Sequence, residues 1–262
     1  MEHLIITAII ILVISLVFSM FGRGGGEFYL PTVVTFLGIP FYTAAGVSLF
    51  LIFLQGASMV FVYSARNKLL DWKLAFVLAI AVASMAFWGG FISHGIPAIY
   101  LKALFAIFLL ISAYFMLKRK KVSARKGMVG VWHREFSGGS YDVNLLYVIL
   151  PVALAAFVAG MVGISGCGLI IPICILLGGV PLSIAMGTNT FLVLTSSSMS
   201  FLGHVLKGGF DWKLCLILGL MVLLGSQIGS RIHTRVNENF LRIGFVVILV
   251  VASLWMIAKI FF

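Results

Sequence analysis

The chain has 262 residues, of which 62% belong to the hydrophobic set AVILMFWYC and only 10% are charged. Soluble domains average about 45–50% apolar residues, glycine included, and about 25% charged residues, so this composition excludes an ordinary water-soluble fold. The 18 Lys and Arg against 7 Asp and Glu give a net charge of +11, and because these bases stand mostly between apolar runs they indicate membrane anchoring rather than nucleic-acid binding.

Apolar runs in the first part of the chain predict a series of membrane helices, since a bilayer-spanning helix takes about 20 residues. The first run covers residues 4–21 and ends at a glycine cluster, residues 22–27. Because no Lys or Arg precedes this run and no small-residue cleavage site follows it, we expect a retained helix rather than a signal peptide. The next expected segments are a short stretch at 28–38, closed by Pro40, and long spans at 41–63, 72–93 and 97–117.

The second part of the chain repeats this order. A polar segment, 118–142, carries seven of the bases and separates the two parts. A second glycine cluster, residues 163–168, again precedes a short apolar stretch that is closed by a proline, Pro181. The expected segments here are a span at 144–162, a short stretch at 169–179, and long spans at 182–204, 212–231 and 240–261.

Glycines, prolines and a DWKL tetrapeptide recur at a nearly constant spacing, which indicates an internal duplication. At an offset of 141 residues, Gly22 falls on Gly163 and Pro31 falls on Pro172. After one deletion the offset becomes 140, and the tetrapeptide at 71–74 falls on the one at 211–214. We therefore predict a first transmembrane repeat (1–117), a basic cytoplasmic loop (118–142) and a second transmembrane repeat (143–262).

The predicted fold is an all-α integral membrane protein of two homologous halves, each with about four full transmembrane helices plus one short broken or re-entrant helix. If the short segments are re-entrant, the halves are parallel, and if they cross the membrane, the halves are inverted repeats. The positive-inside rule places 13 bases inside in the parallel arrangement and 14 in the inverted one, so it does not separate them. The uncharged start of the first helix favours an outside N-terminus and hence the inverted arrangement.

Both halves place a glycine cluster at the junction between a helix and a short helix. Backbone at membrane depth must be buried in protein or line a cavity, and paired interruptions in two halves point to the substrate site of a transporter. The N-terminus of the following helix favours an anion. The alternative is that these glycines let helices pack closely. The candidate substrate-binding residues of the two junctions are Gly22, Arg23, Gly24, Gly25, Gly26, Gly163, Ser165, Gly166 and Gly168.

Two charged residues, Arg23 and Glu27, stand in the first cluster, whereas Ile164 and Gly168 occupy the matching positions of the second. Three readings stay open. The two side chains pair with each other as a structural lock, or Arg23 faces an anionic substrate with Glu27 as a proton-coupling partner, or both are solvated charges at the membrane interface.

A polar stretch follows Pro181, and its first-half counterpart holds Ser48, Gln55, Ser58 and Tyr63. Hydroxyls and amides inside a span either bond between helices or line a polar path. Thr188, Asn189 and Ser48 fall near the glycine junctions in sequence, so we add them to the candidate substrate-binding residues. His204 is expected at the interface.

The DWKL tetrapeptides have a structural interpretation. Trp72 and Trp212 are expected to anchor their spans at the membrane interface, and Asp71 and Asp211 to cap the helices that follow.

Sequence signatures of enzymes and metal sites are absent. The chain has no HExxH, no G-K-[ST] phosphate loop and no G-x-S-x-G turn, and no span holds a pair of carboxylates. The three cysteines show no metal-binding spacing. We expect neither catalysis nor a cofactor nor a metal.

An ordered set of motifs occurs twice: a Gly-rich break, a proline, an A-x-G-[TV]-[SN] segment and a D-W-[KR] start to a later span. The matching stretches are Gly22 to Gly26 with Pro31, Ala44 to Ser48, Gly163 to Gly168 with Pro172, and Ala185 to Asn189. This set resembles the TauE/SafE family of sulfite and organosulfonate exporters over nearly the whole chain apart from the central basic loop. The second cluster departs from the family pattern by reading Gly-Cys-Gly, and Val47 replaces the usual threonine.

The resemblance implies an integral inner-membrane transporter that moves small sulfur-containing anions outward. Residues and resemblance together predict a secondary transporter or exporter of sulfite or organosulfonates in the cytoplasmic membrane, working by alternating access around the two junctions. The expected partners are a small anionic substrate and the lipid bilayer, with no nucleic acid, and a homo-oligomer is not indicated. Two alternatives are an anion-selective channel and a membrane subunit that docks a partner through its basic central loop.

Overall fold

A computed structural model describes residues 2–66, 68–117, 130–136, 139–164, 166–207, 210–232 and 238–261. Within these residues the helices are α1 (Glu2–Met20), α2 (Gly26–Leu37), α3 (Phe41–Phe61), α4 (Trp72–Ser93), α5 (Ala98–Leu117), α6 (Leu145–Val162), α7 (Cys167–Leu176), α8 (Leu182–Val205), α9 (Trp212–Ile232) and α10 (Glu238–Phe261). A π-helical turn, η1 (Val62–Arg66), extends α3. Two strands, β1 (Val131–Phe136) and β2 (Gly139–Asn144), form an antiparallel hairpin.

Five of the described helices are long and apolar enough to cross a membrane: Glu2–Met20, Phe41–Arg66, Trp72–Ser93, Leu145–Val162 and Trp212–Ile232. Their outward faces carry large apolar side chains, such as Ile80 and Leu216, that are exposed in the isolated protein. Such a surface suits lipid rather than water. The prediction of an all-α membrane protein is confirmed.

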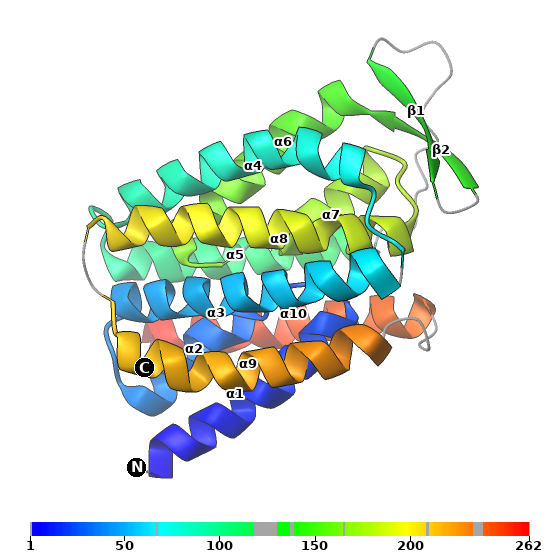
Figure 1. The fold of residues 1–262 in the computed structure, drawn as a ribbon. Coiled ribbons are helices and arrows are strands. Elements are labelled where there is room, and N and C mark those ends of the chain that lie inside the picture. The colour runs from blue at the N-terminus through cyan, green and yellow to red at the C-terminus, as the bar shows by residue number, and fades with distance from the viewer. Residues whose placement is uncertain are drawn as a thin grey trace.

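The helices lie roughly side by side in one bundle, with the β1–β2 hairpin beyond one end and both chain termini toward the other (Figure 1). We call these two ends the hairpin face and the termini face. The hairpin begins within the segment 118–142, which was predicted only as a basic loop, and ends at Asn144. Residues 118–129 and 137–138 of that loop are outside the described residues.

Equivalent helices of the two predicted halves run in opposite directions. At the termini face Tyr42, at the start of α3, donates a hydrogen bond to the His204 carbonyl near the end of α8 over 2.9 Å. Further along, Gly56 of α3 packs directly on the backbone of Leu194. The pair α3 and α8, which the offset of 141 relates, is therefore antiparallel, and this direction favours the inverted arrangement over the parallel one.

Contacts between the halves follow the sequence offset. Gly22 packs against the backbone of Met186, and its counterpart Gly163 packs against Ala45, the counterpart of Met186. In both cases a Cβ atom on the glycine would overlap its neighbour, and both glycines have positive φ, +64° and +86°. This reciprocity is what a two-fold relation between the halves produces, whereas the duplication itself and the domain limits stay predictions.

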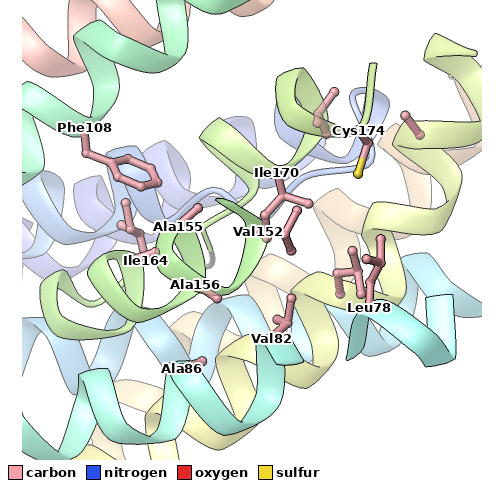
Figure 2. Packing of buried hydrophobic residues seen from close by; sticks show 14 of the residues in the cluster. Leu78, Val82, Ala86, Phe108, Val152, Ala155, Ala156, Ile164, Ile170 and Cys174 are labelled. Carbon is pink, nitrogen blue, oxygen red and sulfur yellow. The ribbon is translucent and has the colours of Figure 1, made fainter. Parts of the chain in front are cut away.

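Small residues bring α4 and α6 into close contact in the largest core cluster. Figure 2 shows Leu78, Val82 and Ala86 of α4 on the side of α6 that carries Ala156. Gly160 lies against the Ala86 backbone. Close approach of this kind is the usual way in which membrane helices associate, because lipid supplies no hydrophobic driving force between them.

Candidate functional site

The first helix break joins α1 to α2 and is buried. Gly22 turns the chain with a left-handed φ of +64°, and the Arg23 N–H donates to the Phe18 carbonyl over 3.2 Å. The Gly25 N–H donates to the side chain of Gln55 over 2.8 Å. These bonds satisfy backbone groups that a membrane interior would otherwise penalise.

Arg23 and Glu27 form a buried ion pair within this break. Their exposed fractions are 0% and 1%, and Arg23 Nη2 lies 2.5 Å from Glu27 Oε1. The reading of the two side chains as solvated interfacial charges was therefore wrong. Removing two ions from water carries a large desolvation cost. The close contact between Arg23 and Glu27 offsets that cost only in part.

Gln55 of α3 is the centre of the hydrogen bonds around the break. Its Oε1 accepts from the Gly25 N–H and from the Tyr29 hydroxyl over 2.9 Å, and its Nε2 donates to Ser19 Oγ over 2.8 Å and to the Ser15 carbonyl over 3.2 Å. All five residues are buried. Gln55 belongs to the polar positions noted in the first half but is not among the predicted substrate-binding residues. Its signal was an amide inside an apolar span, which must find partners there.

Tyr63, at η1, makes a further contact with the end of α1. Its hydroxyl donates to the Ser19 carbonyl over 2.9 Å. The matching contact in the other half is made by His204, whose Nε2 lies 3.2 Å from the Gly160 carbonyl, at the position that corresponds to Ser19. His204 is 2% exposed and lies in the last turn of α8, and its expected place at the interface stays a prediction.

The second break, between α6 and α7, meets the first. Gly163 and Gly166 both have positive φ, and Gly166 is the residue that precedes α7. A Cβ atom on Gly26 would lie 3.3 Å from the Ile164 side chain, so the start of α2 touches the second junction. Gly168 is buried, and Ser165 lies outside the described residues.

The α8 candidates contact the first break. Asn189 Nδ2 donates to the Gly22 carbonyl over 2.9 Å, and Thr188 Oγ1 accepts from the Asp71 N–H over 3.2 Å. Ser48 is fully buried on α3, one turn from Ala45, which packs on Gly163. Within the described residues neither Ser48 Oγ nor Asn189 Oδ1 has a hydrogen-bond partner, so both retain bonding capacity.

Most other hydroxyls of α8 bond within their own helix. Thr190 donates to the Gly187 carbonyl and Ser197 donates to the Val193 carbonyl. Ser200 instead reaches the Gly160 carbonyl of α6 over 3.1 Å. These hydroxyls therefore bond within a helix or between helices, which is the alternative to lining a polar path.

The DWKL prediction of helix caps is confirmed. Asp71 Oδ1 accepts from the N–H groups of Lys73 and Leu74, and Asp211 Oδ1 accepts from those of Lys213 and Leu214. Trp72 and Trp212 are 37% and 60% exposed. This exposure is compatible with the role of membrane-interface anchors, and that role stays a prediction.

An apolar cavity of about 430 Å³ lies apart from the two breaks, between α5, α6 and α7. Side chains such as Phe108, Leu154 and Ile173 line it, and none of its lining residues is polar. It offers nothing to bind an anion. Among the described residues no group of three or more His, Cys, Asp and Glu side chains could hold a metal ion.

Comparison with known proteins gives one family. A family model described as "Sulfite exporter TauE/SafE" matches residues 7–256. A relative from Methanocaldococcus jannaschii, named "Probable membrane transporter protein", is 27% identical, with 98% of this chain and 97% of the relative covered. A Bacillus subtilis protein of the same description is 25% identical, with 90% of each chain covered.

A plant relative carries the family name itself. "Sulfite exporter TauE/SafE family protein 5" of Arabidopsis thaliana is 27% identical, with 59% of this chain and 38% of the relative covered. No solved structure matches the chain.

Proposed function

We propose that this chain, which belongs to the TauE/SafE sulfite exporter family, carries a small sulfur oxyanion or organosulfonate across the cytoplasmic membrane by alternating access around its two helix breaks. The chain is a multi-pass membrane protein, and its family and relatives are membrane transporters rather than enzymes. Beyond membrane transport, we propose a sulfur oxyanion or organosulfonate as the substrate, the two helix breaks as the site, alternating access as the mechanism and the cytoplasmic membrane as the location.

The buried Arg23–Glu27 pair carries the proposal. A guanidinium presents several N–H donors and binds oxyanions with strong charge-assisted bonds. While Glu27 is ionised, its carboxylate pairs with the Arg23 guanidinium and competes with an anion for it. When Glu27 takes up a proton, Arg23 becomes available to an anion, so proton and anion bind together. Competition between carboxylate and substrate for one guanidinium thus supplies a route to proton coupling.

Two further features support a site at this place. The start of α2 contributes the partial positive charge of a helix N-terminus beside Arg23. The contact between Gly26 and the second break at Ile164 brings both halves to one point. Because the equivalent helices run in opposite directions, rocking of one half against the other would expose this point to each face in turn.

Sulfite flux in proteoliposomes tests the proposal. We compare the wild type with Glu27→Gln, Arg23→Gln and the double variant, and use Arg231→Gln on the exposed end of α9 as a matched control. We expect Arg23→Gln to abolish saturable uptake, Glu27→Gln to remove the dependence of uptake on pH, and Arg231→Gln to behave like the wild type.

The same assay separates the alternatives. Full transport by the double variant would make the pair a structural lock only and would overturn the proposal. An anion channel would carry current and show no counterflow exchange, whereas a carrier exchanges labelled for unlabelled sulfite. Deletion of 118–129 that abolished transport without harming insertion would favour a docked partner instead.

A further inference from the structure

A second buried charge cluster lies away from the helix breaks, at the hairpin face. The carboxylate of Asp71, which is 0% exposed, accepts two bonds from Arg134: Nη2 to Oδ1 over 2.6 Å and Nε to Oδ2 over 3.1 Å. The Tyr141 hydroxyl donates to the same Oδ2 over 2.6 Å. Two groups of the hairpin thus hold one carboxylate at the start of α4, and the transport site proposed above does not use them.

The hairpin fixes both donors in place. Arg134 and Tyr141 are directly opposite each other in the β1–β2 register. The Arg134 guanidinium also lies 4.5 Å from the centre of the Trp132 ring, two residues away on the same strand. Stacking on an aromatic ring and a bidentate bond are both particular to the planar guanidinium, so lysine would reproduce them only in part.

Burial alone would raise the pKa of the Asp71 carboxyl, but hydrogen bonds from Arg134 and Tyr141 hold that pKa below its usual range. The carboxylate is therefore ionised at neutral pH, and the pair is a true ion pair there.

The cluster connects to the transport site through an unbroken series of contacts. The Asp71 N–H donates to Thr188 Oγ1 over 3.2 Å. The next residue, Asn189, holds the Gly22 carbonyl of the first break. Gly187 packs on the Leu69 carbonyl without room for a Cβ atom, so the start of α8 lies directly on the segment before α4.

The equivalent position in the other half lacks this arrangement. Asp211 caps α9 through Lys213 and Leu214, as Asp71 caps α4. Asp211 is partly exposed, and within the described part of the chain no basic or hydroxyl side chain bonds to it. Of these two equivalent aspartates, only Asp71, at the hairpin face, therefore accepts bonds from side chains of another element within the described residues.

We infer that the β1–β2 hairpin is a latch that holds the starts of α4 and α8 together, and that Arg134 is a positioning residue whose release from Asp71 opens the hairpin face. A transporter with inverted halves must open one face while the other stays closed. Within the described residues, the side-chain bonds that hold Asp71 have no counterpart at Asp211, so the hairpin face has a closing contact of its own. The inference needs the transport function of the family and is independent of the identity of the anion and of the role of Arg23.

Hydrogen exchange of the full chain in lipid nanodiscs, followed by mass spectrometry, tests the latch without any substrate. In Arg134→Gln we expect the amides of 68–75 and 182–190 to exchange about tenfold faster or more, because 68–75 loses its tie to the hairpin and 182–190 packs on 68–75. The segment 210–215 around Asp211 should keep its wild-type rate. Arg134→Lys should restore part of the protection, and the matched variant Asp211→Asn should leave 68–75 and 182–190 unchanged.

The opposite results overturn the latch. Unchanged exchange at 68–75 and 182–190 in Arg134→Gln means that the hairpin does not hold them. Equally faster exchange at both faces means a general loss of stability rather than release of one face. If Arg134→Gln does not fold, Tyr141→Phe removes a single bond and is read at the same segments, where we expect a smaller increase of the same one-sided kind. Because no anion is added, these results are separate from the outcome of the sulfite experiment.

Discussion

The side-chain amide of Asn189 donates to the Gly22 carbonyl over 2.9 Å, so a residue of the second half holds the helix break of the first half. Both groups are buried. The broken backbone is thus stabilised across the boundary between the predicted halves, so the proposed movement of one half against the other would act directly on the candidate site.

Asn189→Leu should destabilise the protein by about 1–3 kcal/mol, because it leaves the Gly22 carbonyl buried without this donor. Transport should fall more than the modest loss of stability explains, since the lost bond is at the break itself. Thermal unfolding of the purified protein and sulfite flux measure the two effects. Ser198→Ala is the control, because the Ser198 hydroxyl bonds only to its own helix, at the Thr195 carbonyl. Equal effects of the two substitutions would contradict the prediction.

Gly22→Ala should destabilise much more than Gly38→Ala. Both glycines have φ near +65°, so an alanine at either position bears the same backbone strain, roughly 1–2 kcal/mol. At Gly38 no atom lies within 4 Å of the added Cβ, whereas at Gly22 the Met186 carbonyl occupies its place. The steric overlap should add about 1–3 kcal/mol. Unfolding temperatures of the two variants give the difference directly, and similar values would show that the helices at Gly22 separate easily.

Gln55→Leu should cost about 2–4 kcal/mol, since it removes four hydrogen bonds and leaves buried partners on α1 and α2 unsatisfied. Gln227→Leu is the matched comparison. Gln227 donates one bond to Ser58 and accepts one from the exposed Arg231, so we expect a smaller loss. The unfolding temperatures of both variants are measured in the same detergent. A Gln227 variant as unstable as the Gln55 variant would argue against a special role for the break.

The stability difference between wild type and Arg134→Gln should depend on pH in one direction. The folded pKa of Asp71 is lowered, so the stabilisation from the pair is fully present above the usual aspartate value of about 4 and is lost as the pH falls through the lowered value. Unfolding temperatures should therefore differ by a constant amount from pH 8 down to about pH 5, and the difference should shrink below about pH 4. A difference that grew on acidification would contradict the assignment of Asp71 as the ionised partner.

Much of the fold is predictable from sequence because each span is a continuous apolar run with a marked start. Pro40 and Pro181 directly precede α3 and α8, and Asp71 and Asp211 precede α4 and α9, so these four starts are predicted to the residue. The hairpin is not predicted, because β1 and β2 alternate polar and apolar residues weakly and stand beside a strongly basic run.

The candidate site is predictable only in part. The positions of the two glycine breaks are visible as paired interruptions, whereas the burial of Arg23 and Glu27 is not, since a sequence does not say what covers a loop. The Gln55 network joins residues 26 to 40 positions apart, and the Arg134–Asp71 pair joins residues 63 positions apart. Contacts of that range depend on how the helices pack.

The unequal charges of the two breaks have a consequence for the transport cycle. In the predicted duplication Arg23 falls on Ile164 and Glu27 falls on Gly168, so the two equivalent breaks differ in charge. Under the proposed alternating access, the conformation open to the hairpin face and the one open to the termini face would therefore differ in energy. The proposed carrier would then have different half-saturation concentrations for the same anion on its two sides, and its rates of loading and unloading would be unequal even at equal concentrations.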